Sequence, residues 1–177
     1  GISATRSEQR MREARAERAR TQLFALGSAV PASVPFLIEE LAAYPGDNVS
    51  RQLDEALASQ GLSRRERARL RMAQAILSGE QDPPADLIDE VCAQLLHAHG
   101  PPEQVASELV MLTDLIDRHG YRPLFEDRLW RTSQRQRSDD PTTFRALAAL
   151  DAIRSRVPDW SRVKSDLVAK MLTLGPY

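Results

Sequence analysis

The densest group of side chains that could carry out chemistry is Cys92, His97 and His99, which lie within eight positions of one another. A zinc site takes thiolate and imidazole ligands from donors that converge on one point. On a helix, His97 and His99 are two residues apart and diverge, and Cys92 falls on the apolar side with Ile88 and Leu95. The pattern therefore favours a core cysteine and two histidines at a helix C-terminus, where positive charge suits the helix dipole, over a metal site.

Carboxylates form a second set of candidates, because paired acids can act as general acid and base. The acids in question are Glu39, Glu40, Glu55, Asp86, Asp89 and Glu90. Each falls on the side of its segment expected to face solvent. The chain has no Ser-His-Asp order, glycine-rich phosphate loop or Gly-x-Ser-x-Gly elbow. The sequence therefore predicts no catalytic residue, no cofactor and no metal ligand, and a small helical enzyme ranks behind the binding functions.

Arginine supplies nearly all of the positive charge, since 24 residues are Lys or Arg and only two of these are lysines. The run RRERARLR, residues 64–71, places Arg64, Arg67 and Arg71 on one side of a helix. The simplest interpretation is a solvated face paired with neighbouring acids. Among ligands, an acidic protein patch is favoured over nucleic acid, because the net charge is −1 and nucleic-acid-binding domains are usually basic.

The segments that must carry these residues are expected to be helices. Glycine and proline interrupt the chain at short intervals, and the stretches between them have the 3.6-residue apolar period of a helix. Aromatic residues make up 5% of the chain and strand-forming runs are nearly absent, so leucine and alanine must form the core. We predict about nine helices. Five cover roughly residues 5–26, 32–44, 48–59, 85–99 and 122–133, and four more begin near residues 63, 102, 141 and 158.

Several predicted helices begin with recognisable capping residues. Ser63 and Glu66 have the spacing of a capping box. Asp140 precedes Pro141, which suits the first helical position. Ser33 is the expected N-cap of the second helix.

An internal similarity suggests how the helices are organised. The segments LAAYPGDNVSRQLDEAL (41–57) and LIDRHGYRPLFEDRLW (115–130) each contain an apolar helix end, a glycine break and a second apolar helix. Their offset of about 72 to 74 residues is near two repeats of a helical solenoid, and short connections make sequential helices antiparallel. The predicted fold is all-α, with antiparallel helices stacked as pairs in a short HEAT-like or armadillo-like solenoid. Residues 1–30 would form a charged N-terminal helix and a candidate linker, and 31–177 the helical-repeat domain.

Three stretches also carry a family resemblance. They are VPFLIEELAAY with VSRQLDEAL, then RARLRMAQAIL, then FRALAALDAI with VPDWSRVKSDLVAKMLTLGPY. In this order they resemble the helical-repeat segment of large bacterial signalling proteins that also carry serine/threonine kinase or formylglycine-generating-enzyme (sulfatase-modifying-factor)-like domains. Pro158 and Trp160 match the helix start of that family, whereas DAIRSR lacks its aromatic-Asp-Pro turn. The resemblance implies an interaction or linker module with no catalytic residues.

Two functions are consistent with this architecture. The first is a non-enzymatic protein–protein interaction or scaffold module, which binds a partner protein or adjacent domains of its parent chain. The alternative is a regulated adaptor in a bacterial stress or defence system. A solenoid offers a long outer face that can vary without harm to the core. The residues expected to be accessible to a partner are Arg64, Arg67, Arg71, Tyr44 and Tyr121.

The ends and the apolar runs of the chain bear on its location. No apolar run approaches the ~18 residues needed to span a bilayer, so we expect no membrane insertion by this segment. The N-terminus GISATRSEQ lacks the apolar core of a signal peptide. Gly1 stands where Met normally begins a chain, and we expect a piece of a longer protein. A cytoplasmic location is expected, with the extracytoplasmic side of a membrane-anchored parent as the alternative.

Overall fold

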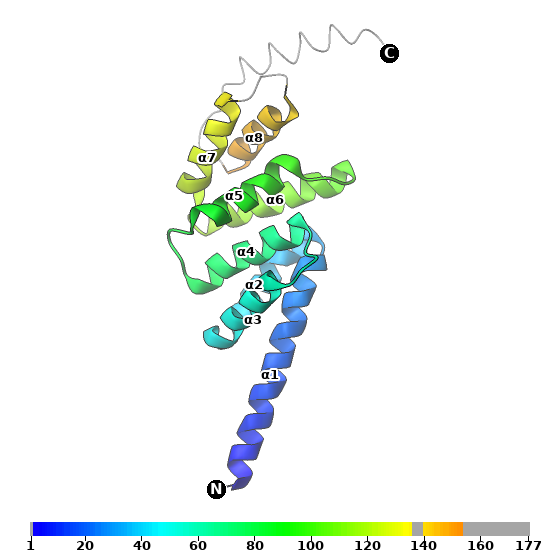
Figure 1. Cartoon of the computed structure of the whole chain (residues 1–177), viewed down its shortest axis with the longest axis vertical. Coiled ribbons are helices and arrows are strands. Elements are labelled where there is room, and N and C mark those ends of the chain that lie inside the picture. Colours follow the sequence, from blue (N-terminus) through cyan, green and yellow to red (C-terminus); the bar gives the residue numbers. More distant parts are fainter. Residues whose placement is uncertain (1, 136–139, 154–177) are drawn as a thin grey trace. The chain divides into compact units, whose positions relative to one another are not determined.

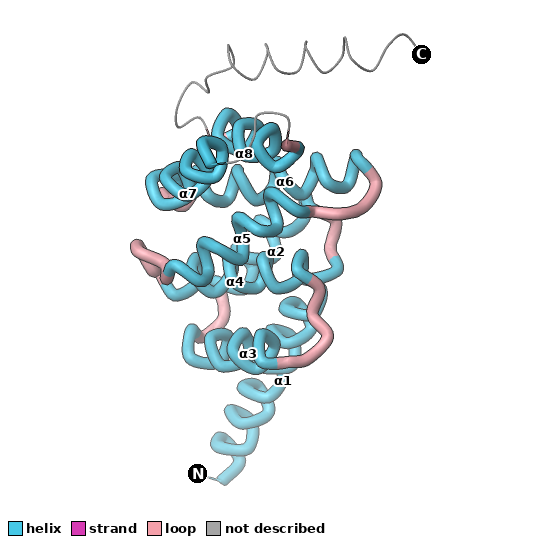
Figure 2. The backbone as a smooth tube through the Cα atoms, turned by 45° about the horizontal axis from the view of Figure 1, so that its top comes forward, coloured by secondary structure: helices cyan, strands magenta, loops and turns pink. Residues whose placement is uncertain are grey.

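The computed structural model describes residues 2–135 and 140–153, and every regular element in these ranges is a helix (Figures 1 and 2). The elements are α1 (Ile2–Ser28), the 3-10 helix η1 (Pro31–Ser33), α2 (Val34–Ala42), α3 (Gly46–Ala58), α4 (Arg64–Ser78), α5 (Ala85–His97), α6 (Pro102–Arg118), α7 (Arg122–Arg135) and α8 (Pro141–Ala152). The all-α prediction is confirmed for these residues. The helix predicted from residue 158 lies outside the described residues.

The helices form two compact units that divide between Pro83 and Pro84. The first unit contains α1 to α4, and the second contains α5 to α8. The units do not divide at residues 30 and 31, where we expected the helical-repeat domain to begin. The reason is that α1 packs on α2, α3 and α4, so the N-terminal helix is part of the first unit.

In the first unit, α1 and α4 each contact the other three helices (Figure 1). The buried apolar side chains of α4 are Ala68, Leu70, Met72, Ala73 and Ala75. The other helices contribute Ala19, Leu23, Leu26, Val34, Ile38, Leu41, Val49 and Leu53 to the core. Residues 5–15 of α1 are exposed, because the apolar residues of this helix are concentrated near its C-terminal end. The free energy of burial therefore fixes the second half of α1 to the unit.

In the second unit, every helix contacts the other three, and α8 packs on α5, α6 and α7. Its buried residues include Ala146, Leu147, Ala149 and Leu150. Alanine is common on the buried faces of both α4 and α8, and its short side chain lets neighbouring helices approach closely. The rest of this core consists mainly of Leu87, Val91, Leu95, Leu112, Leu115, Ile116, Phe125 and Leu129.

The predicted caps are confirmed at two helix starts and wrong at a third. Ser63 Oγ accepts from the Glu66 N–H at 3.1 Å, and the Ser63 N–H donates to Glu66 Oε2 at 2.8 Å, which completes the capping box. Asp140 Oδ1 accepts from the Thr142 N–H at 2.7 Å. Ser33 makes no side-chain cap, because the 3-10 turn before α2 already holds it in a helical conformation (φ −88, ψ −15). An N-cap side chain needs an extended backbone to reach the next turn.

A buried arginine holds a helix end in the first unit. Arg69, on α4, is 0% exposed. Its Nη1 donates to the carbonyl oxygens of Leu26, Gly27 and Ala29 at 3.1, 3.1 and 2.8 Å. The last carbonyls of a helix have no partner within it and carry partial negative charge. The guanidinium satisfies these carbonyls at the end of α1, where they are covered by the core.

A second arginine does the same in the second unit. Arg145, on α8, is half-buried, and its Nη1 donates to the carbonyl oxygens of Leu96 and Ala98 at 2.9 and 3.0 Å. These carbonyls lie at the C-terminal end of α5. In each unit, therefore, an arginine on the last described helix donates hydrogen bonds to the carbonyl end of the first helix.

No helix in the described ranges has both the length and the apolar character required to cross a membrane.

Candidate functional site

The three arginines predicted to share a face of α4 differ in their surroundings. Arg64 is exposed, whereas Arg67 and Arg71 are half-buried. Arg67 Nη1 donates to the carbonyl oxygen of Leu57 at 3.4 Å, and Arg71 Nη1 donates to Gln74 Oε1 at 3.4 Å. Two of the three guanidinium groups are thus already engaged within the first unit.

Tyr121 is buried, with 3% of its surface exposed, so the expectation of an accessible side chain is wrong. α6 ends at a Schellman turn, in which Gly120 adopts φ +77 and the Tyr121 N–H donates to the Ile116 carbonyl at 3.0 Å. A residue in this position commonly packs back against the helix that it follows. Tyr121 therefore belongs to the core of the second unit.

Tyr44 lies at the edge of a hollow between α1 and α2 that the sequence did not reveal. The hollow has a volume of about 400 Å³ and belongs wholly to the first unit. It is lined by Arg15, Arg18, Gln22, Glu40, Ala43, Tyr44 and Pro45. We call it the α1–α2 hollow. Its size falls within the range of sites that hold a ligand or a short peptide segment.

Helical spacing and two glutamines position the lining of the hollow. Arg15, Arg18 and Gln22 are three and four residues apart and so share one face of α1. Gln22 Nε2 donates to Glu40 Oε2 at 3.1 Å, which joins α1 to α2 at the hollow. Gln52 Nε2, from α3, donates to the Ala16 carbonyl at 3.0 Å. The segment of α1 that carries both arginines is thus held from two other helices.

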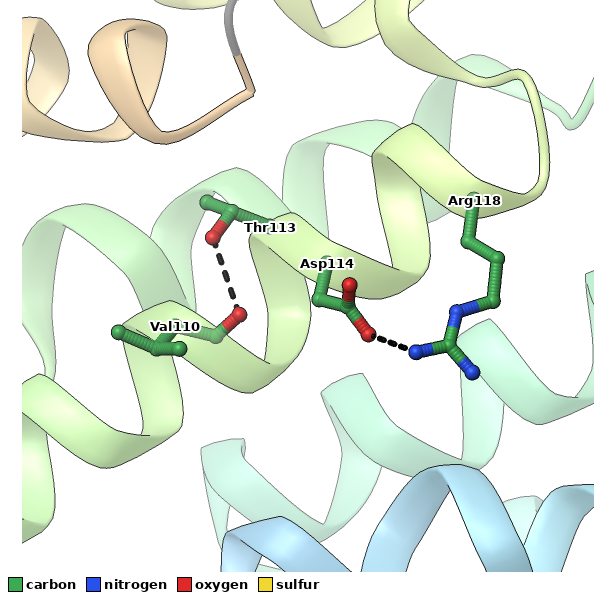
Figure 3. Close-up of polar contacts among 4 residues, drawn as sticks. All are labelled: Val110, Thr113, Asp114 and Arg118. Carbon is green, nitrogen blue, oxygen red and sulfur yellow. Dashed lines mark hydrogen bonds and ion pairs between the residues drawn. The ribbon is translucent and has the colours of Figure 1, made fainter.

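The two arginines of the hollow have no polar partner among the described residues. Arg15 and Arg18 are exposed, and neither makes a hydrogen bond or ion pair with any described residue. Figure 3 shows the opposite case in α6, where Arg118 Nη2 pairs with Asp114 Oδ2 at 2.7 Å. In the same view, the Thr113 hydroxyl donates to the Val110 carbonyl at 3.1 Å. The guanidinium donors of the hollow, in contrast, face solvent.

The remaining polar groups of the hollow provide acceptors. Glu40 is half-buried and adds one negative charge, so the ionised lining side chains sum to +2 − 1 = +1. Gln22 Oε1 is buried and has no hydrogen-bond partner among the described residues. The Tyr44 hydroxyl makes no hydrogen bond with a described residue. The hollow can therefore donate strongly from one side and accept at Glu40 and Tyr44.

The sequence contained only a weak signal for this site. Arg15 and Arg18 belong to a helix rich in charged residues, in which many arginines share the same spacing. Arg15 and Arg18 differ from the other arginines of α1 only because the packing of α1 on α2 places them at the hollow. Glu40 was expected to be solvated, whereas it is half-buried and accepts from Gln22.

Cys92 is a core residue, as the sequence predicted, with 3% of its surface exposed. Burial raises the pKa of its thiol to about 12, so the side chain stays protonated at neutral pH and is a poor nucleophile and metal ligand. His97 and His99 are exposed. In the described ranges, no three His, Cys, Asp or Glu side chains are grouped as a metal site requires.

Searches of the chain against protein-family models, curated proteins and solved structures gave no match.

Proposed function

We propose that this chain is a non-enzymatic protein–protein interaction or scaffold module, built from helix pairs in the manner of a HEAT-like solenoid. The α1–α2 hollow is the observation that carries this proposal. It presents the uncommitted guanidinium groups of Arg15 and Arg18 beside Glu40 and Tyr44 on a firmly packed helical unit. Groups of this kind suit the recognition of another molecule.

Contacts between successive helices are consistent with the helix-pair organisation. Each sequential pair is in contact, namely α1 with α2, α3 with α4, α5 with α6, and α7 with α8. The connections between the helices of a pair are short, as between His97 of α5 and Pro102 of α6. A solenoid is built from such pairs, each of which buries its apolar side on its neighbours.

The rigidity of the first unit also supports a binding function. Arg69 holds the end of α1 through three carbonyl groups, and Gln52 holds the same helix at Ala16. A surface whose side chains are already positioned loses less conformational entropy on binding. The lining of the hollow is therefore positioned before a partner binds.

The partner class follows from the resemblance given above. We propose that the chain is part of a larger bacterial signalling protein, and that the partner is another protein or a neighbouring domain of the same parent.

Affinity capture tests this proposal. The tagged chain is exposed to a lysate of the source bacterium beside a variant whose exposed charged positions are scrambled, and bound proteins are identified by mass spectrometry. We expect one or a few proteins to be retained by the native surface alone. Each is then purified and titrated, with an expected Kd of about 10 μM or tighter. Retention of no protein above the scrambled variant would refute the proposed function.

A further inference from the structure

The donors of the α1–α2 hollow match a carboxylate. A guanidinium group can form two parallel hydrogen bonds with a carboxylate, a stronger arrangement than a bond between neutral groups. Arg15 and Arg18 are three residues apart on one helix face, which brings their Cβ atoms to roughly 5–6 Å. Neither has an internal ion pair among the described residues that a ligand would have to displace.

Glu40 restricts the kind of anion that the hollow can accept. Its Oε2 is occupied by Gln22, and its carboxylate charge stays at the hollow beside the arginines. A phosphate group or a nucleic-acid backbone would bring dense negative charge against this carboxylate, and like charges in a site repel. A peptide carries an acidic side chain next to a backbone N–H, so it can satisfy the arginines and donate to Glu40 at the same time.

Tyr44 and Pro45 provide the surface for the rest of such a segment. Both lie in the turn after α2 and line the hollow. Tyrosine combines a broad apolar ring with a hydroxyl group, which is why it is common where proteins bind one another. The ring can pack on the aliphatic part of an acidic side chain while the hydroxyl group bonds the peptide backbone.

From these features we infer that the α1–α2 hollow binds an acidic segment of the partner protein, with Arg15 and Arg18 on its carboxylates, Glu40 on a backbone N–H and Tyr44 beside the chain. The inference rests on the proposed function and specifies the partner's chemistry. It also assigns recognition to α1 and α2 instead of the α4 arginines Arg64, Arg67 and Arg71.

A direct titration tests the site without a known partner. The full chain, labelled with ¹⁵N, is titrated with a short peptide of alternating Glu and Ser, with its Lys–Ser counterpart, and with inorganic phosphate. We expect the acidic peptide alone to shift, in a saturable way, the side-chain amide of Gln22 and the backbone amides of residues 15–22 and 43–46. The shifts should weaken with added salt, because exposed charges are screened.

Two double variants localise the effect to the hollow. Arg15→Glu/Arg18→Glu should raise the Kd of the acidic peptide about tenfold or more, equivalent to about 1.4 kcal/mol of binding free energy. Arg10→Glu/Arg20→Glu makes the same charge change on the same helix at exposed positions outside the hollow. It should weaken binding less than about threefold, as expected for screened charges at a distance. If Arg15→Glu/Arg18→Glu melts at a lower temperature than the native chain, the test is repeated with Arg15→Gln/Arg18→Gln, which removes the positive charges without adding negative ones.

The outcomes separate this inference from the proposed function. Equal losses in both double variants, absence of shifts around the hollow at saturating peptide, or equal shifts with phosphate would each overturn the acidic-segment site. Capture of the same protein from lysate by the native chain and by Arg15→Glu/Arg18→Glu would also overturn the site, yet it would leave the interaction function standing. Failure of capture by the native chain, with a normal peptide titration, would instead count against the proposed function.

Discussion

Arg69 and Arg145 occupy equivalent places in the two units. Arg69 lies on α4 and donates to the carbonyl end of α1, and Arg145 lies on α8 and donates to the carbonyl end of α5. In each unit, the contact joins residues at least 40 positions apart, such as Arg69 with Gly27 (42 positions) and Arg145 with Leu96 (49 positions). The same device thus connects the last described helix of a unit with the first.

Replacement of Arg69 should destabilise the first unit strongly. Arg69→Met keeps the length and the helix propensity of the side chain but leaves the carbonyls of Leu26, Gly27 and Ala29 covered and without this donor. We expect the free energy of unfolding to fall by about 3 kcal/mol, since each buried polar group left unsatisfied costs about 1–3 kcal/mol. Hydrogen exchange of the α1 and α4 amides measures the loss. Arg64→Met, on the exposed side of the same helix, should change it by less than about 0.5 kcal/mol. Similar effects of the two substitutions would contradict this role of Arg69.

Replacement of Arg145 should also lower the free energy of unfolding, but by less than replacement of Arg69. Arg145 is half-buried and donates to two carbonyl groups, so water can replace part of the lost hydrogen bonding. We expect Arg145→Met to lower the free energy of unfolding by about 1–2 kcal/mol. The increase in exchange should be confined to the second unit, above all to the last turn of α5. Faster exchange in α1 instead of α5 would be inconsistent with this assignment.

Two glycines should respond to alanine in opposite directions. Gly79 ends α4 with φ +67, a conformation that side chains with a Cβ rarely adopt. Gly79→Ala should therefore destabilise the chain by about 1 kcal/mol. Gly46 lies in the first turn of α3, and the position that a Cβ would occupy there is open. Gly46→Ala should therefore be neutral or stabilise the chain by up to about 0.5 kcal/mol. Urea denaturation of both variants measures the contrast, and a loss at Gly46 as large as that at Gly79 would show that backbone conformation is not the cause.

The capping box should make stability depend on pH in the acid range. Hydrogen bonds with Ser63 lower the pKa of Glu66, and the bond with the Ser63 side chain has a larger effect than the bond with its backbone. The folded state therefore favours the ionised carboxylate, and its contribution is present above the ordinary pKa and is lost as pH falls through the folded pKa. The stability advantage of the native chain over Glu66→Gln should be larger at pH 6 than at pH 3. Urea midpoints at the two pH values measure it, and an advantage that does not change with pH would exclude this linkage.

Cys92 should be protected from thiol reagents and should affect stability at alkaline pH. Its pKa of about 12 arises chiefly from burial, so the folded state retains a proton that the unfolded thiol loses near pH 9. The stability contributed by the neutral thiol is complete below pH 9 and declines as pH rises toward 12. Labelling with a thiol reagent at pH 8 should be at least about 100-fold slower in the native chain than in urea, because only the thiolate reacts. Equal rates in the two conditions would mean that Cys92 is accessible.

Much of the local structure could be predicted because its causes lie close together in the sequence. The 3.6-residue apolar period predicted a helix over residues 32–44. Of its apolar stripe, Val34, Ile38 and Leu41 are buried, and Leu37 and Tyr44 are half-buried. Ser63 and Asp140 cap their helices through partners two or three residues away. These interactions depend on short stretches of chain, so the residue types and their spacing are sufficient to reveal them.

The local rules were insufficient where the fold brings distant residues together. Tyr121 was expected to be accessible to a partner, but the turn at the end of α6 directs it into the core. Arg69 looked like one more member of a basic run, yet it is the arginine that the core encloses. The candidate site itself depends on Gln22 meeting Glu40, 18 positions away.

By itself, therefore, the sequence determined that this chain is helical, where most of its helices begin, and which stripes of leucine and alanine they bury. Only the tertiary structure decided that the chain divides at Pro83 and Pro84, that Arg69 is enclosed, and that Arg15 and Arg18 border a hollow. The physical reason is that helix formation and capping depend on neighbours within about four residues. Burial of a charge and the shape of a hollow depend instead on how helices cross, which involves residues tens of positions apart.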